Sequence, residues 1–214
     1  RLITQLGLAN RIDLAGEVDE LRVFLRRPEC ANHIYQAMES DDARLRVFAY
    51  RLVSHTLRDN EDLQRRVAAD GEPVVRAWFA SQLVVLGSDQ RLKWLGHMIK
   101  DRSTYVACRV IRSLDSDLKD LFRSQLMVAA CSSSKPVREA ARFAVEDWTR
   151  NEVADLYRDK LTGAVVSSAE PGLIGGLGET GTTQDAELLK TYTTSYRSRV
   201  RFEAVRAIAQ LDRE

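Results

Sequence analysis

YRSRVRFEAVRAIAQL, residues 196–211, is the stretch of sequence that decides the fold class. Its apolar residues Val200, Ala204 and Ile208 stand four positions apart, a spacing that places them on one face of an α-helix. Charged and polar residues fill most of the positions between them. The segment is therefore predicted to be an amphipathic helix that buries one stripe.

The same stripe recurs along the chain at nearly constant intervals. Its first residue is Leu45, Val75, Val106, Val137, Leu173 or Val200, with successive intervals of 30, 31, 31, 36 and 27 residues. Four residues further on stand Ala49, Phe79, Val110, Ala141, Leu177 and Ala204, and eight further on stand Val53, Leu83, Leu114, Val145, Gly181 and Ile208. We number positions from the first residue of each stripe, so that Val200 is position 0 and Ala204 is position +4. Position +1 is an arginine in four stripes, at Arg46, Arg76, Arg138 and Arg201.

Prolines and shorter amphipathic stretches complete the repeating unit. Pro73, Pro136 and Pro171 each precede a stripe, and proline suits the first turn of a helix, where its missing N–H has no partner to lose. Between the stripes, residues 92–99, 118–128, 153–165 and 186–192 predict a second helix for each unit. A period of about 31 residues with two helices per unit is typical of an α-solenoid. We therefore predict an all-α superhelix of about six helical-hairpin repeats over residues 41–214.

The unit Val-Arg-x-x-Ala, followed by the apolar stripe, resembles a HEAT repeat. Residues 176–189 and 196–211 are similar to the short bacterial HEAT-like repeats of the phycobiliprotein-lyase type, and the resemblance covers about residues 41–214. It implies the fold, while the family includes scaffolds, nucleic-acid binders and a few enzymes. It also implies that an acidic residue in the turn pairs with the repeated arginine, which would place Asp41 or Asp42 on Arg46 and Asp70 on Arg76.

Residues 1–40 match the repeat less well. Segments 2–9, 18–27 and 29–40 have helical patterns, but their order does not keep the two-helix alternation. We interpret residues 1–40 as an irregular N-terminal cap or a partial repeat, which a solenoid needs to cover its terminal apolar face. Residues 41–214 would then form a single continuous domain, and because the first residue is Arg1, we expect a piece of a longer chain.

Composition narrows the classes of function. Among 214 residues, Lys and Arg number 32 and Asp and Glu 31, and this balance argues against a uniformly basic nucleic-acid binder. No apolar run reaches the roughly 20 residues of a membrane-spanning helix, so no membrane partner is expected. Three widely spaced cysteines favour a reducing compartment, for which we expect the cytoplasm.

No cluster of residues matches a catalytic, cofactor or metal motif, and none is predicted. Cys30 and His33 stand at helical spacing, but zinc needs a second pair of ligands. A nucleophilic Cys–His pair stays open as an alternative, because such partners meet only in space. Gly176 and Gly181 have the spacing of a phosphate-binding P-loop, but Thr182 replaces the lysine that this motif requires. We interpret the glycine cluster as a site of close helix packing.

Basic and aromatic residues are interleaved in residues 91–112 and 190–202. Equivalent positions of successive repeats line one surface of a solenoid, so we predict a basic groove along the second helices. Its predicted members are Arg51, Lys93, Arg102, Arg109, Arg112, Arg142, Arg197, Arg199 and Arg206. Arginine and aromatic side chains dominate protein interfaces, but they also bind phosphates and stack on bases, or cover apolar surface on a solvated face.

We therefore expect a non-catalytic scaffold or interaction module that presents the groove to a protein partner or to a neighbouring domain of its own chain. One alternative is nucleic-acid binding through the same groove, with Arg201 added. Another is a HEAT-like enzyme such as a DNA glycosylase or a phycobilin lyase subunit. Carboxylates beside the arginines would weaken the nucleic-acid alternative, and an enzyme would need a pocket with a perturbed acid or thiol.

Overall fold

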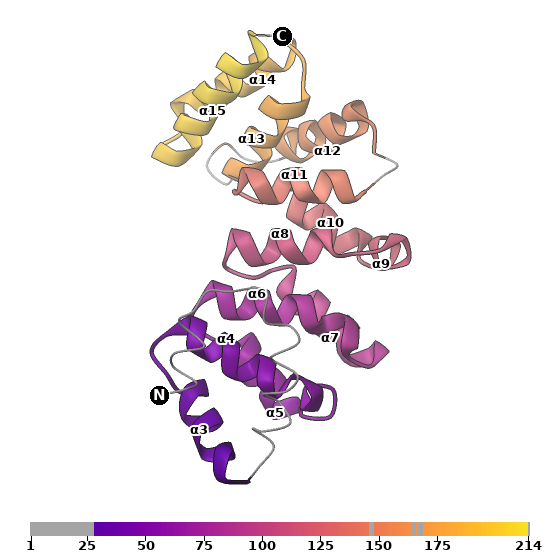
Figure 1. Ribbon diagram of the computed structural model, residues 1–214. Helices are drawn as coiled ribbons and strands as arrows, with labels where there is room; N and C mark the ends of the chain where they lie inside the picture. The colour runs from indigo at the N-terminus through magenta and orange to yellow at the C-terminus, as the bar shows by residue number, and fades with distance from the viewer. Residues whose placement is uncertain (1–27, 146–147, 164–165, 167–168, 214) are drawn as a thin grey trace. The chain divides into compact units, whose positions relative to one another are not determined.

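The computed structural model describes residues 28–145, 148–163, 166 and 169–213 (Figure 1). Every regular element in these ranges is helical, which confirms the all-α class. The chain divides into two compact units, Arg1–Met98 and Ile99–Glu214, and the division falls inside the range that the sequence predicts as one domain. Of the predicted cap, only residues 28–40 are described, so its segments 2–9 and 18–27 lie outside the described residues.

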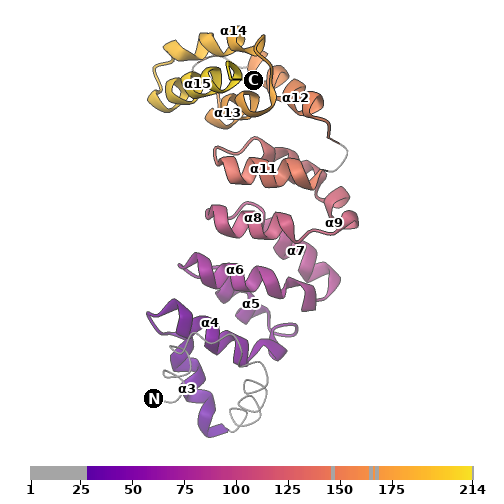
Figure 2. The same cartoon turned by 45° about the horizontal axis from the view of Figure 1, so that its top comes forward.

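The described part of the first unit contains short helices. They are α3 (Pro28–Met38), α4 (Ala43–Leu52), α5 (Glu61–Ala68), α6 (Pro73–Gln82) and α7 (Ser88–Met98), with 3-10 turns at η1 (Ser54–Thr56) and η2 (Leu83–Val85). Helix α4 contacts α3 and α6, and α5 packs against α6 (Figure 2). The striped segments that begin at Leu45 and Val75 are thus neighbouring helices.

The second unit also alternates striped helices with other helices. It contains α8 (Thr104–Arg112), α9 (Ser116–Leu121), α10 (Arg123–Ala130), α11 (Lys135–Ala144), α12 (Arg150–Thr162), α13 (Pro171–Thr180), α14 (Asp185–Lys190), η3 (Thr191–Thr194) and α15 (Ser198–Leu211). Helix α11 contacts α8, α10 and α13, while α13 packs between α12 and α15 (Figures 1 and 2). In the described ranges of the chain, no helix is long and apolar enough to cross a membrane.

Burial confirms the stripe that the sequence predicts. The residues at position +4 of all six striped helices have 0% exposed surface. Position 0 is buried in five of them, and Leu45 is half-buried. Helices α6 and α13 begin at Pro73 and Pro171, and α11 has Pro136 in its first turn, as predicted.

Two features of the second helices differ from the expectation. The predicted helix 118–128 is two helices, α9 and α10, which meet at Phe122. At this residue the backbone leaves the helical conformation, with φ of −95° and ψ of 13°, and the side chain is buried. Helix α5 is the second helix between the first two stripes, for which the sequence analysis gave no range, and Asn60 caps it by accepting a hydrogen bond from the Leu63 N–H at 2.9 Å.

The arginine at position +1 holds the turn that precedes its helix. In each case its Nη1 donates to the backbone carbonyl six residues earlier: Arg46 to Ser40 at 2.7 Å, Arg76 to Asp70 at 2.7 Å, Arg138 to Ser132 at 2.8 Å and Arg201 to Ser195 at 2.8 Å. Carbonyls in these turns have no partner within a helix, so the guanidinium satisfies them. The arginine at position +1 is therefore part of the local fold at these four helices.

The prediction that the carboxylate of Asp41 or Asp42 pairs with Arg46 is wrong. Its Nε and Nη2 donate to the carboxylate of Asp70, at 2.8 Å and 2.7 Å, instead of to Asp41 or Asp42. Asp42 caps α4 by accepting from the Arg44 N–H at 2.8 Å. Asp70 also offers its backbone carbonyl to Arg76, so it joins two successive repeats. A turn carboxylate can reach the arginine of the repeat before it, which local spacing does not reveal.

The glycines of α13 are contact points between helices, as the sequence interpretation holds. A Cβ at Gly176 would lie 2.4 Å from the Tyr157 ring of α12, and one at Gly178 would lie 2.5 Å from the Ala207 Cβ of α15. Both glycines lie inside a helix, whose backbone N–H groups bond to carbonyls one turn earlier. This segment is therefore not the loop that a phosphate-binding motif requires.

Candidate functional site

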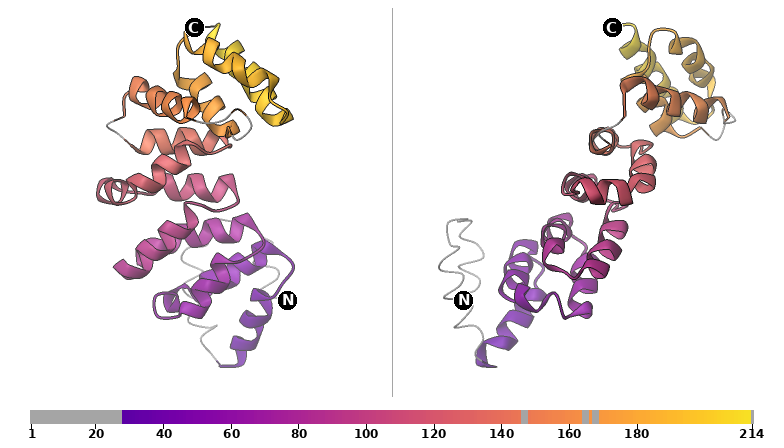
Figure 3. Two further views of the ribbon diagram at one scale, coloured as in Figure 1. Left: turned by 180° about the vertical axis from the view of Figure 1, so that it is seen from behind. Right: turned by 90° about the vertical axis from the view of Figure 1, so that its right-hand side faces the viewer.

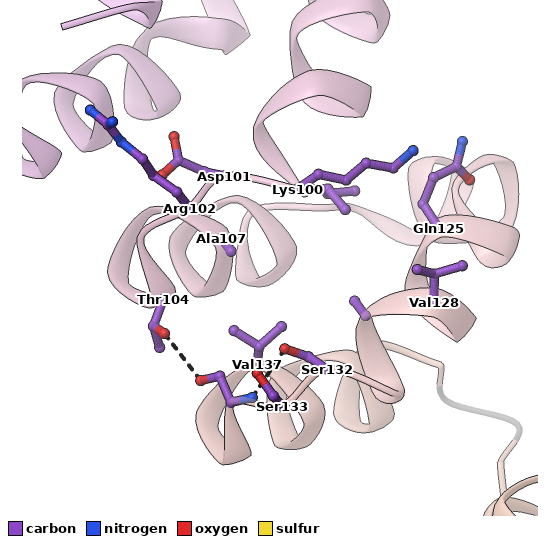
Figure 4. Close-up of a pocket in the computed structure, with 13 residues that line it drawn as sticks. Lys100, Asp101, Arg102, Thr104, Ala107, Gln125, Val128, Ser132, Ser133 and Val137 are labelled. Atoms are coloured by element: carbon purple, nitrogen blue, oxygen red, sulfur yellow. Dashed lines mark hydrogen bonds between the residues drawn. The ribbon is translucent and has the colours of Figure 1, made fainter. Parts of the chain in front are cut away.

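A pocket of about 360 Å³ lies in the second unit beside α8, α10 and α11 (Figure 4). It is lined by Ile99, Lys100, Asp101, Arg102, Thr104, Ala107, Gln125, Val128, Ala129, Ser132, Ser133, Ser134 and Val137. Of the nine predicted groove residues, only Arg102 is among them. The serine run 132–134, between α10 and α11, supplies three of the other lining residues.

Most of the polar groups in this pocket already have partners. The hydroxyls of Thr104 and Ser134 are hydrogen-bonded at 3.1 Å, and Ser132 Oγ accepts from the Ser134 N–H at 3.2 Å (Figure 4). Gln125 Oε1 is buried and has no hydrogen-bond partner within the described ranges. Figure 4 shows Lys100 and Gln125 reaching toward the same side, while Arg102 extends away from them. These groups suit a small polar contact at the rim of an interface and do not converge on one reacting atom.

Helices α8 and α11 expose an aromatic and basic surface near this pocket. Tyr105, Arg109 and Arg112 stand at i, i+4 and i+7 of α8, and all three are exposed. Phe143 of α11 is 85% exposed and occupies position +6, as Arg112 does in α8. Because α8 packs against α11, these two positions belong to neighbouring helices. We call Tyr105, Arg109, Arg112 and Phe143 the α8/α11 face.

Arg142, a predicted groove residue, lies instead in a buried ionic cluster. Its Nη1 donates to Glu179 at 2.8 Å and to the Tyr157 hydroxyl at 3.3 Å. Arg138 also donates to Glu179 through Nε and Nη2, and the side chains of Arg138 and Glu179 are only 1% and 4% exposed. Position +5 of α11 faces α13, which explains why Arg142 turns inward.

The cluster also contains Arg206, Glu203 and Tyr157. Arg206 Nη2 lies 3.3 Å from Glu203 and 4.0 Å from Glu179. Burial raises the pKa of Tyr157. Its hydroxyl donates to the Ala130 carbonyl at 2.7 Å. The cluster joins α10, α11, α12, α13 and α15. Each of these contacts is made within the fold, so we assign the cluster to the stability of the unit.

The other predicted groove residues have varied surroundings. Lys93 Nζ binds Glu61 at 2.8 Å and lies 5.6 Å from the Trp94 ring. Arg197 donates to the Ala169 carbonyl at 3.1 Å. Arg51 of α4 and Arg199 of α15 are exposed. Arg51 and Lys93 belong to the first unit and the other seven to the second, so the predicted groove residues are divided between the two units.

The three cysteines and His33 are the residues to consider for nucleophilic or metal chemistry. Burial raises the pKa of the Cys108 thiol and of the Cys131 thiol, which disfavours the thiolate that a nucleophile needs. Cys30 and His33 both lie on α3, and His33 is exposed. Three or more residues of metal-ligand type do not gather anywhere in the part of the chain that the structure describes.

No protein-family model matches this chain, and no curated protein is similar to it in sequence. The geometry of the α8/α11 face and the pattern of the repeats therefore carry the functional argument.

Proposed function

We propose that this chain is an α-solenoid of HEAT-like repeats that acts as a non-catalytic interaction module. In this proposal the α8/α11 face is presented to a protein partner or to a neighbouring domain of the same chain. Support for the repeat comes from the six buried residues at position +4 and from the four arginines that bind the carbonyl six residues earlier. Such a fold buries each repeat against its neighbours and leaves a long surface for binding.

The exposed Phe143 is the observation that carries the function. A phenylalanine that is 85% exposed keeps its ring in water, where burial by a partner would stabilise it by about 2 kcal/mol. Tyr105, Arg109 and Arg112 accompany it, and aromatic and arginine side chains are the types that contribute most to protein interfaces. The arginines favour a partner surface with acidic side chains.

Nucleic-acid binding and an enzymatic function, the two alternatives, have less support in the side-chain contacts. Lys93, Arg142 and Arg206 lie beside carboxylates, so three of the nine predicted cations are already neutralised. This weakens binding of nucleic acid, in which each cation would release a counterion from a phosphate. For an enzyme we would expect an acid with a raised pKa in a cleft, whereas Asp70 and Asp185 have pKa values below their ordinary range, in ion pairs with Arg46 and Arg158.

The compartment and the source that we propose for the protein rest on its cysteines and on its resemblance to HEAT-like repeats. The three cysteines are free, which supports a reducing compartment such as the cytoplasm. A bacterial source rests on the resemblance of residues 176–189 and 196–211 to short HEAT-like repeats. We propose no cofactor and no metal for the α8/α11 face, whose aromatic and basic groups suit contact with another protein.

Two binding measurements test the proposal. The first titrates the chain with fluorescent single- and double-stranded oligonucleotides at low and moderate salt. Tight binding with a steep salt dependence would contradict the protein-partner assignment and favour nucleic acid. The second is affinity capture with the wild type, Arg112→Glu and Phe143→Ser, followed by direct titration of the captured protein.

We expect each of these two substitutions to weaken binding of the captured partner by about tenfold or more, as for a residue at the centre of an interface. Tyr35→Ser is the matched control, because Tyr35 is an exposed aromatic residue on α3 of the first unit. Unchanged binding of the partner by both Arg112→Glu and Phe143→Ser would refute the α8/α11 face as its site.

A further inference from the structure

Position +1 of α8 is an alanine, Ala107, whereas four other striped helices have an arginine at this position. In those four, the guanidinium donates to the backbone carbonyl six residues earlier. Three of them, Arg46, Arg76 and Arg201, also donate to the carbonyl five residues earlier, at 3.2 Å, 3.1 Å and 2.9 Å. Ala107 has only a methyl group, so the turn before α8 receives neither bond from position +1.

The pocket of about 360 Å³ lies where that arginine would be. The carbonyls six and five residues before Ala107 belong to Asp101 and Arg102, and all three residues line the pocket. Helix α11 packs against α8 (Figure 3), and its Val137, at position 0, lines the same pocket. The other residue at position +1 that is not an arginine is Ile174, whose larger side chain is fully buried. Ala107 is therefore the small member of the six, and the pocket takes the place of the missing side chain.

The acidic partner of the missing arginine is replaced as well. Arg46 binds Asp70, which stands five residues before the first residue of the next stripe. The residue at the same place before the stripe of α11 is Ser132, which lines the pocket. Asp70 and Ser132 are held alike, since each side chain accepts a hydrogen bond from the backbone N–H two residues later, at 2.8 Å and 3.2 Å. The pocket thus lacks both the guanidinium and the carboxylate but keeps the turns that would hold them.

A cation and an amide stand at another side of the pocket. Lys100 is exposed, and its ammonium has no ion-pair partner within the described ranges. Figure 4 shows Lys100 and the Gln125 amide reaching toward the same side, while Arg102 extends away from them. An ammonium and an amide N–H both donate hydrogen bonds, so the two groups suit a carboxylate. Apolar side chains, among them Ile99 and Ala129, also line the pocket.

We propose that this pocket binds a small guanidino carboxylic acid, which has a guanidinium and a carboxylate at opposite ends of a short apolar chain. The guanidinium would donate to the carbonyls of Asp101 and Arg102, as the arginine at position +1 does in other turns, and to Ser132 Oγ. A carbonyl oxygen has two lone pairs, so this binding does not require Asp101 or Arg102 to be without other partners. The carboxylate would take Lys100. A volume of about 360 Å³ lies in the range of small-molecule sites, about 300–1,000 Å³.

Titration of the full chain with γ-guanidinobutyrate tests the proposal, by calorimetry and by NMR of the backbone amides. We expect a dissociation constant of about 1 mM or tighter, as for a ligand of about ten non-hydrogen atoms, with shifted amide signals at Ala107 and Ser132. The matched control compound is γ-aminobutyrate, which should bind at least about tenfold more weakly, because an ammonium lacks the planar, paired donors of a guanidinium.

Two substitutions that rebuild the arginine–carboxylate pair locate the site. Ala107→Arg should weaken binding of γ-guanidinobutyrate by more than about tenfold, because its own guanidinium would fill the pocket. It should also keep or raise the melting temperature, since arginine holds the turn at this position in four other helices. Ser132→Asp should instead strengthen binding by about tenfold, the effect of one charge-assisted pair, because it restores the carboxylate that Asp70 offers to Arg46.

A third substitution tests the carboxylate end. Lys100→Gln should weaken γ-guanidinobutyrate by several-fold but leave butylguanidinium, which has no carboxylate, unchanged. Arg112→Glu is the control on the α8/α11 face and should change binding by less than about twofold. The proposal uses the stripe positions and a different surface from the α8/α11 face, so its failure leaves the proposed function standing.

Several results would overturn the proposal. They are absence of binding to the wild type, equal binding of γ-aminobutyrate, and binding that Ala107→Arg leaves unchanged. If Ala107→Arg does not fold, Ser132→Asp decides, and unchanged or weaker binding by that variant refutes the site. N-acetylarginine amide has the same guanidinium without a free carboxylate. Its binding more tightly than γ-guanidinobutyrate would show that the pocket takes an arginine side chain of a polypeptide instead of a free small molecule.

Discussion

Replacing Gly178 by alanine should destabilise the second unit, although helix propensity alone predicts the opposite. Glycine inside a helix is about 1 kcal/mol less favourable than alanine, so an exposed site would gain stability from the change. At Gly178 the new Cβ would lie 2.5 Å from the Ala207 Cβ and 2.7 Å from the Ala207 Cα. Since one of these atoms belongs to the backbone, α13 and α15 would have to move apart.

The net effect follows from two opposing terms. Overfilling a packed core costs about 1–3 kcal/mol, and the need to move a helix places Gly178→Ala at the upper end. Subtracting the propensity gain of about 1 kcal/mol leaves a loss of about 2 kcal/mol. For a chain of this length, that loss lowers the melting temperature by about 4–8 °C.

Circular dichroism melting and urea denaturation measure this change, with Gly163→Ala as the matched control. Gly163 ends α12 with ordinary right-handed backbone angles, and its Cβ would meet only the Asp159 carbonyl at 3.5 Å. Gly163→Ala should therefore keep or slightly raise the stability, by up to about 1 kcal/mol. Equal or greater stability of Gly178→Ala relative to the wild type would refute the close α13–α15 contact.

Three further changes test the ionic and apolar parts of the fold. Asp70→Asn should lower the free energy of unfolding by about 1–3 kcal/mol at neutral pH, because Arg46 loses its carboxylate. Burial raises the pKa of Asp70, but hydrogen bonds from Arg46 and from a backbone N–H outweigh it and hold the pKa below its ordinary value. The stability from this pair is therefore present at neutral pH and lost as the pH falls below about 4. In urea melts over that pH range, the free energy of unfolding of Asp70→Asn should fall less than that of the wild type. Glu179→Gln should cost about 3–5 kcal/mol in chemical denaturation, because the buried guanidinium of Arg138 loses its counter-charge, and a loss below about 1 kcal/mol would contradict the buried cluster. Ala204→Asp should cost several kcal/mol, since it places a carboxylate in a fully buried stripe, and melting at the wild-type temperature would refute the helix alignment.

Helix positions were predictable wherever the apolar stripe was strong. The proline-led starts of α6, α11 and α13 and the buried residues at position +4 follow from helical periodicity, which is a local property. The break between α9 and α10 was not predictable from local sequence, because residues 116–130 contain neither Gly nor Pro to mark it. Helix α5 was missed because its apolar stripe is short, with Leu63 and Val67 as its buried apolar anchors.

The candidate binding surface was predictable only in part. Arg109 and Arg112 lie on an exposed face of α8, as the groove prediction requires, but Arg142 is half-buried and binds Glu179. The exposed ring of Phe143 was not singled out, since an apolar residue in an amphipathic helix is ordinarily assigned to the core. The available signal was that Phe143 stands at position +6, on the polar side of the predicted helix.

The sequence by itself determined the all-helical class, the buried stripe and the close packing around the glycines of α13, because these depend on spacing within one helix or on residue size. Only the tertiary structure decided which carboxylate each arginine takes and how the polar groups of the pocket pair. Arg46, Arg138 and Arg201 share one local motif, yet the first two bind acids of the following repeat and the third binds none in the described chain. That difference arises because long side chains reach between repeats, so their partners depend on which helix packs against which.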